Sequence, residues 1–233
     1  MAARSNIMVL SGGGLKSAVV AARCLADGHV IFVHVNYGQR SAAAEVQSLR
    51  TLATHFQTAS PLELETPHAL QIQQRLSGPD GPRAAASPTG VVGTHALSPS
   101  TLRGLFPVLL SIGAQAAWRI GAAKLLTGVS RLTDGAHLGL PGPETHPDYL
   151  REFIQDFTIA TETFGLRSAL TVEAPLADFT YDDFARLAVH LNVPIELTWS
   201  CLAGGHEPCG LCLGCTTRGR ALATAGAPEP VTV

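Results

Sequence analysis

The C-terminal part of the chain carries four cysteines whose spacing suits one metal ion. Cys201, Cys209, Cys212 and Cys215 follow the pattern C-x7-C-x2-C-x2-C. The two tight C-x2-C steps bring thiolates within reach of a single tetrahedral ion. We predict a structural zinc site, because four protein ligands leave no open position on the metal. Four unrelated cysteines and an iron–sulfur cluster are the alternatives.

A second candidate site lies near the N-terminus, where an apolar run meets a glycine loop that consists of Gly12, Gly13 and Gly14. Backbone N–H groups of such a loop, together with the dipole of a helix that begins near Lys16, can bind a phosphate group. The Walker pattern is absent, because Leu15 rather than glycine precedes Lys16. A plain tight turn is the alternative for this loop.

These residues must be positioned by an alternation of strands and helices. Apolar runs predict strands over Asn6–Leu10, His29–Val35, Ala123–Val129 and Leu170–Pro175. Helices are predicted over Lys16–Asp27, Ser41–Phe56, Phe106–Ile120 and Pro147–Phe164. A further helix is expected to be capped by Thr180, with Asp183 completing a capping box, and to end near Asn192. The alternation predicts an α/β fold with the glycine loop at the C-terminal end of the first strand, where such sheets bind ligands.

Two long segments have no sustained period. Ser77–Ser100 is rich in glycine, proline, serine and alanine, and we predict that it is a flap. Ser130–His146 is the second long loop.

The composition favours a protein whose ligand is a small molecule. The chain has 233 residues, of which 46% are hydrophobic, and a formal net charge of -2. That charge gives no overall field that would attract nucleic acid or an anionic membrane, and no apolar run reaches the roughly 18 residues of a membrane span. Five cysteines, four of them clustered, favour a metal site in a reducing compartment. We expect a cytoplasmic protein.

Four segments together resemble the 7-cyano-7-deazaguanine synthase (QueC) family. They are the strand and glycine loop ending at Ser17, Asn36–Arg40, Pro147–Phe153, and Glu196–Cys201 with its continuation through Arg218. The resemblance extends from about residue 6 to about residue 222. It implies a doubly wound, mostly parallel α/β sheet of the ATP-pyrophosphatase (PP-loop) group over residues 1–200. A zinc knuckle over 201–222 and a tail over 223–233 would follow.

The resemblance also implies the reaction. Members of the family convert 7-carboxy-7-deazaguanine, ammonia and ATP to 7-cyano-7-deazaguanine through an adenylated carboxylate, and often form homodimers. Ser11, Gly12, Gly13, Gly14 and Ser17 would then bind phosphate, with Mg²⁺ as a further cofactor. His34 and Val35 would lie against adenine, although a buried core histidine is equally open. Arg40, Asp148 and Glu152 are expected to face the substrate, or else to be solvated charges or helix caps.

One residue departs from the family pattern at the centre of the chemistry. Lys16 stands where the family motif S-G-G-x-D-S has aspartate. An ammonium there would repel Mg²⁺ by an energy on the order of several kcal/mol. Lys16 would alternatively contact phosphate directly and replace part of the charge that the metal supplies. A diverged enzyme that joins the acid to another amine, perhaps on a protein, and a subunit that only binds ligand are therefore kept beside the synthase.

Overall fold

The computed structural model describes residues 4–65, 105–130, 147–165 and 170–227. The predicted flap over 77–100 and the loop over 131–146 lie outside these residues. The described strands form one sheet in the order β3-β2-β1-β4-β5, and every neighbouring pair is parallel. Strands are therefore added on both sides of β1, so the predicted doubly wound α/β sheet is confirmed.

The elements follow the predicted alternation closely. The strands are β1 (Asn6–Leu10), β2 (His29–Asn36), β3 (Leu62–Glu65), β4 (Ala122–Thr127) and β5 (Thr171–Glu173). The helices are α1 (Leu15–Cys24), α2 (Ala42–His55), α4 (Leu105–Arg119), α6 (Pro147–Phe164), α7 (Tyr181–His190) and α8 (Leu213–Thr224), with a 3-10 turn, η4 (Ile195–Leu197). β3, η4 and α8 were not predicted.

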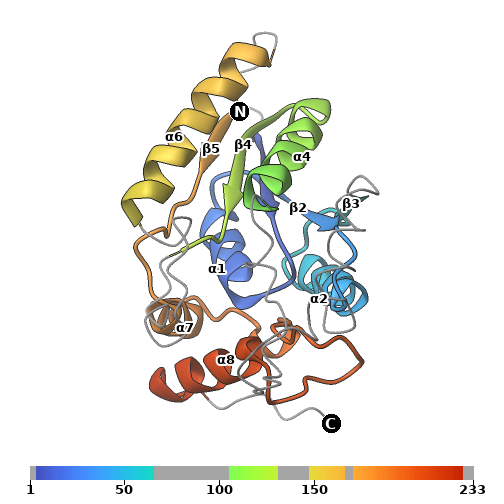
Figure 1. Cartoon of the computed structure of the whole chain (residues 1–233), viewed down its shortest axis with the longest axis vertical. Helices are drawn as coiled ribbons and strands as arrows, with labels where there is room; N and C mark the ends of the chain where they lie inside the picture. Colours follow the sequence, from blue (N-terminus) through green and yellow to red (C-terminus); the bar gives the residue numbers. More distant parts are fainter. Residues whose placement is uncertain (1–3, 66–104, 131–146, 166–169, 228–233) are drawn as a thin grey trace, which may run out of the picture.

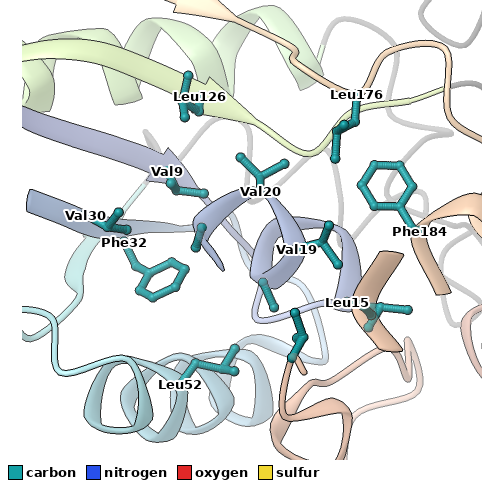
Figure 2. Close-up of a cluster of buried hydrophobic side chains, with 14 of the residues drawn as sticks. Val9, Leu15, Val19, Val20, Val30, Phe32, Leu52, Leu126, Leu176 and Phe184 are labelled. Carbon is teal, nitrogen blue, oxygen red and sulfur yellow. The ribbon is translucent and has the colours of Figure 1, made fainter. Parts of the chain in front are cut away.

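Helices cover both faces of the sheet (Figure 1). On one face, α1 packs with α2, α7 and α8 around a core that includes Val9, Phe32 and Leu126. Figure 2 shows side chains of α1, among them Val19 and Val20, between the sheet and Phe184 of α7. On the other face, α4 and α6 cover Met8, Val33 and Leu125. Neighbouring residues of β1 thus enter opposite cores, which explains why this strand is apolar throughout.

The described helices include none that is both long and apolar enough to cross a membrane.

Helix α7 begins as predicted. Its N-cap Thr180 accepts a hydrogen bond from the backbone N–H of Asp183, and the Asp183 carboxylate accepts one from the backbone N–H of Thr180. Thr180 also donates its hydroxyl to this carboxylate over 2.7 Å. These bonds, with that of the Thr180 hydroxyl first, hold the pKa of Asp183 below its usual value. The start of α7 is therefore fixed locally, before any tertiary packing.

Replacing Thr180 with alanine removes this cap and is expected to lower the free energy of unfolding by about 1 kcal/mol. The loss would be measured by urea denaturation at pH 7. The control is Thr163→Ala, because the exposed Thr163 bonds through its hydroxyl, among the described residues, only to the carbonyl of Ile159 within α6. Since the folded-state pKa of Asp183 is lowered, its contribution is present above about pH 4 and disappears as the pH falls through that pKa. Equal losses in the two variants would contradict the prediction.

Candidate functional site

The glycine loop lies where the order of strand addition in the sheet reverses. It follows the end of β1, which has β2 on one side and β4 on the other. The backbone N–H of Ser11 still pairs with the carbonyl of Val33 on β2 over 2.9 Å, and the chain then leaves the sheet to begin α1. Crevices at the carboxyl ends of strands beside such a reversal are the usual ligand sites of open α/β sheets.

Two serines connect the start and the end of this loop. Ser11 donates its hydroxyl to the hydroxyl of Ser17 over 2.6 Å, and Ser17 donates to the carbonyl of Gly14 over 3.0 Å. The N–H of Gly13 bonds to the Ser11 hydroxyl over 3.1 Å. The N–H of Gly13 is thus used within the protein here, and convergence of the three glycine N–H groups on an anion stays a prediction. The first serine of the family motif S-G-G-x-D-S aligns with Gly12, or with Ser11 if it is displaced by one position. In the structure the Ser11 hydroxyl bonds to Gly13 and Ser17 and so lies within the turn.

The N-terminus of α1 carries positive charge without compensation from its own helix. Gly14 is the N-cap, no side chain caps it, and the first turn holds no acidic residue. Lys16 is half-buried, and its ammonium donates to the Ser130 hydroxyl over 3.4 Å. Burial lowers the pKa of Lys16 to about 8. An ammonium in this position is destabilised by both desolvation and the helix dipole, and a bound anion would relieve both effects.

The segment after β4 closes tightly on this turn. A Cβ atom added to Gly128 would lie 3.0 Å from the backbone nitrogen of Ser17 and 3.2 Å from the Cβ of Lys16. A side chain here would force its neighbours to shift by a few tenths of an ångström, so Gly128 lets the segment after β4 pack closely on the first turn of α1.

A buried polar network that the sequence did not reveal lies beside the loop. Glu45 on α2 is contacted through one carboxylate oxygen by Nε2 of His34 and by Nε2 of Gln39, each over 2.9 Å. The Ser41 hydroxyl donates to the other oxygen over 2.5 Å. A Cβ atom on Gly12 would lie 3.3 Å from this carboxylate. In the sequence, Glu45 is marked only as an acidic residue in the first turn of a helix, and such residues are too common to indicate a site.

This network accounts for His34. Its side chain is buried and bonded through Nε2 to Glu45 of α2, while Nδ1 has no hydrogen-bond partner among the described residues. The carbonyl of Val35 accepts a long bond, 3.3 Å, from Gln39. The side chain of His34 is thus engaged within the protein, as a core histidine would be, and contact of either residue with adenine remains a prediction.

The three residues expected at the substrate are all exposed. Arg40 is exposed, and its backbone carbonyl lies against Gly204, where a Cβ atom would approach it to 2.6 Å. Asp148 and Glu152 are exposed on the first turns of α6, and Asp148 accepts a bond of 2.7 Å from Arg151. Their role at a substrate stays a prediction.

The four predicted cysteines come together. Their sulfur atoms all lie within 4.8 Å of one another. Cys212 Sγ is 3.5 Å from that of Cys215 and 3.9 Å from that of Cys201. A tetrahedral ion with metal–sulfur bonds of 2.3 Å places its ligands about 3.8 Å apart, so the cluster fits one metal ion. The four cysteines therefore form one cluster that could bind a metal ion.

Local hydrogen bonds favour the thiolate form of one of these cysteines. Backbone N–H groups of Leu211 and then Cys212 lower the pKa of Cys209 to about 6. Burial raises the pKa of Cys201 and of Cys215. A cation at the centre would allow all four to ionise together.

A separate groove of about 560 Å³ lies between α6 and β5, lined partly by Ile154, Thr158 and Val172. None of the residues of the glycine loop lines it.

Comparison with known proteins gives a consistent result over nearly the whole chain. The family model described as "Queuosine biosynthesis protein QueC" matches residues 5–226. The 7-cyano-7-deazaguanine synthase of Synechococcus sp. (strain CC9311) is 32% identical over 97% of this chain and 96% of its own. The protein of the same name from Parasynechococcus marenigrum (strain WH8102) is 32% identical over 98% of this chain and 97% of its own.

Among solved structures, the U34-tRNA thiolase NcsA from Methanococcus maripaludis with its 4Fe-4S cluster is similar, with a TM-score of 0.47 and 11% identity. It covers 95% of this chain and 65% of its own. The family match and the two relatives are sufficient: the chain belongs to the QueC family.

Proposed function

We propose that the protein is an ATP-dependent synthase that converts 7-carboxy-7-deazaguanine and ammonia to 7-cyano-7-deazaguanine. The observation that carries this proposal is the uncapped, cationic start of α1 at the reversal of the sheet. The names of the relatives that match the chain from end to end add support for the substrate.

The reaction requires two activations of the same carbon. The substrate carboxylate attacks the α-phosphorus of ATP, and pyrophosphate leaves. Ammonia then attacks the acyl carbon and displaces AMP and a proton, which gives the amide. The amide oxygen attacks a second ATP with loss of pyrophosphate, and departure of AMP and the two protons on nitrogen leaves the nitrile. The protein must hold the polyphosphate charge and exclude water from each adenylate.

In this proposal the residues of the glycine loop have separate roles. The N–H groups at the start of α1 and the Lys16 ammonium hold the polyphosphate. Ser17 turns its hydroxyl from the carbonyl of Gly14 to a phosphate oxygen. Mg²⁺ would neutralise the phosphates further, and the Glu45 carboxylate lies beside the loop, 3.3 Å from where a Cβ atom on Gly12 would stand. Because three donors already engage Glu45, direct contact between Lys16 and phosphate is the better-supported alternative.

The decisive experiment incubates the purified protein with Mg-ATP, 7-carboxy-7-deazaguanine and ammonium, and detects products by mass spectrometry. The synthase is expected to release AMP and the nitrile, with no AMP when the acid or ammonium is omitted. Amide alone, or product only with another amine, would favour the diverged enzyme. ATP binding without turnover, together with activity in Lys16→Asp, would favour a subunit that only binds ligand.

Lys16→Met is expected to weaken ATP binding about tenfold and yet stabilise the protein at pH 7 by about 1 kcal/mol, because it removes a desolvated ammonium. In a chain of this size that gain raises the melting temperature by about 2–4 °C.

The wild type has a second signature of the same ammonium. The pKa of Lys16 is about 8 when folded and 10.5 ordinarily, so between these values the unfolded chain binds more protons and stability rises with pH. Lys16→Met should lack this rise. Lys124→Met is the matched control, because exposed Lys124 is paired with Glu173 over 2.8 Å and should not gain stability when replaced. A loss of stability in Lys16→Met would refute the assignment.

We propose that the cysteine cluster holds structural zinc in a knuckle over residues 201–222, attached to the α/β domain over 1–200. Elemental analysis is expected to give one zinc per chain in the wild type and markedly less in Cys212→Ser, whose sulfur contacts two others. Cys24→Ser, which changes the cysteine outside the cluster, should retain the metal. Iron and acid-labile sulfide in the wild type would instead indicate an iron–sulfur cluster.

A further inference from the structure

The segment from Leu197 to Cys201, which we call the bridging segment, connects the glycine loop to the cysteine cluster through one residue. The backbone N–H of Trp199 donates to the carbonyl of Gly13 over 2.8 Å. The indole N–H of Trp199 donates to the carbonyl of Cys201 over 2.8 Å. Trp199 therefore bonds at one end to the proposed phosphate site and at the other to a residue that supplies a metal ligand.

At the loop, this contact fixes the most constrained peptide. Gly13 has a φ of +70°, and a Cβ atom there would lie 2.8 Å from the carbonyl oxygen of Glu45. Its carbonyl also accepts from the Ser48 hydroxyl over 2.9 Å, and that hydroxyl lies 2.6 Å from the carbonyl of Leu197. Gly13 is thus held between α2 and the bridging segment. The orientation of its peptide determines where the neighbouring N–H groups of the loop point.

At the knuckle, helix α8 holds the same segment from the other side. A side chain at Gly214 would collide with the carbonyl of Ser200, so α8 packs directly on the bridging segment. Buried Arg218 donates to the Thr198 hydroxyl over 2.5 Å and to the carbonyl of Ile195 over 2.7 Å. Because Cys212 is the N-cap of α8 and Cys215 lies in its first turn, a metal bound to them and to Cys201 ties α8 to the bridging segment.

We infer that Trp199 is a positioning residue for the nucleotide loop, through which the metal in the cysteine cluster raises the affinity of that loop for ATP. This inference rests on the proposed nucleotide site. It implies reciprocity: if the metal strengthens ATP binding by a given factor, ATP strengthens metal binding by the same factor. A knuckle that merely adds stability would leave both affinities of the folded protein unchanged.

The test measures ATP binding calorimetrically, with Mg²⁺ present, to zinc-loaded protein and to protein stripped with a chelator selective for zinc over magnesium. The Kd for ATP is expected to rise about tenfold on stripping, and zinc is expected to bind about tenfold more tightly when ATP is saturating. In zinc-loaded Trp199→Phe, which keeps the backbone N–H but loses the indole bond, ATP should bind more weakly and respond less to zinc.

The chain provides a matched control and a reporter in its second tryptophan. Trp118→Phe, in α4, should retain the full coupling, and it leaves Trp199 as the single tryptophan of the chain. In this variant the emission of Trp199 is expected to change both on zinc removal and on ATP addition.

Each unfavourable outcome has a separate meaning. If the zinc-loaded wild type binds no ATP, the proposed nucleotide site fails. Equal ATP affinity with and without zinc in folded protein overturns only the coupling. If circular dichroism shows that stripped protein unfolds, the loaded variants decide, and equal ATP affinity in Trp199→Phe and Trp118→Phe overturns the inference.

Discussion

The carbonyl of Gly13 is the point on which the candidate site depends. It accepts hydrogen bonds from the Ser48 hydroxyl on α2 and from the backbone N–H of Trp199. Gly13 also has a positive φ, and a Cβ atom there would collide with the backbone of α2. The loop is consequently a piece of backbone held by elements on two sides of it. In the proposed phosphate site this packing would preorganise the backbone of the loop before ligand arrives.

Charge is distributed around this loop in two separate places. Glu45 is hydrogen-bonded to His34, Gln39 and Ser41, whereas Lys16 contacts the neutral Ser130 hydroxyl. The loop therefore presents net positive character where the family motif has a carboxylate. This substitution changes the electrostatics of the site, while the strand, glycine turn and helix that position it are present.

Sequence reasoning succeeded where structure is determined locally. The apolar runs of β1 and β2, the capping box of Thr180 and the spacing of the four cysteines need only near neighbours to be interpreted. It failed where position depends on distant partners. The alternating Leu62–Glu65 forms a strand because β2 offers it an edge, and Glu45, Ser48 and Trp199 reach the loop only through tertiary packing. Helix α8 was missed because its sequence has no amphipathic pattern. Its buried side includes the charged Arg218, whose guanidinium is hydrogen-bonded to Thr198.

The bridging segment also has a consequence for how the protein is made. The loop residues emerge from the ribosome well before their partner Trp199 and the last cysteine, which follow some two hundred residues later. Contacts of such long sequence separation form late, because the intervening chain must first be closed into a loop. A nascent chain that has already built its central strands thus still lacks a completed site. Completion of the glycine loop therefore waits until the bridging segment and the cysteines have been translated.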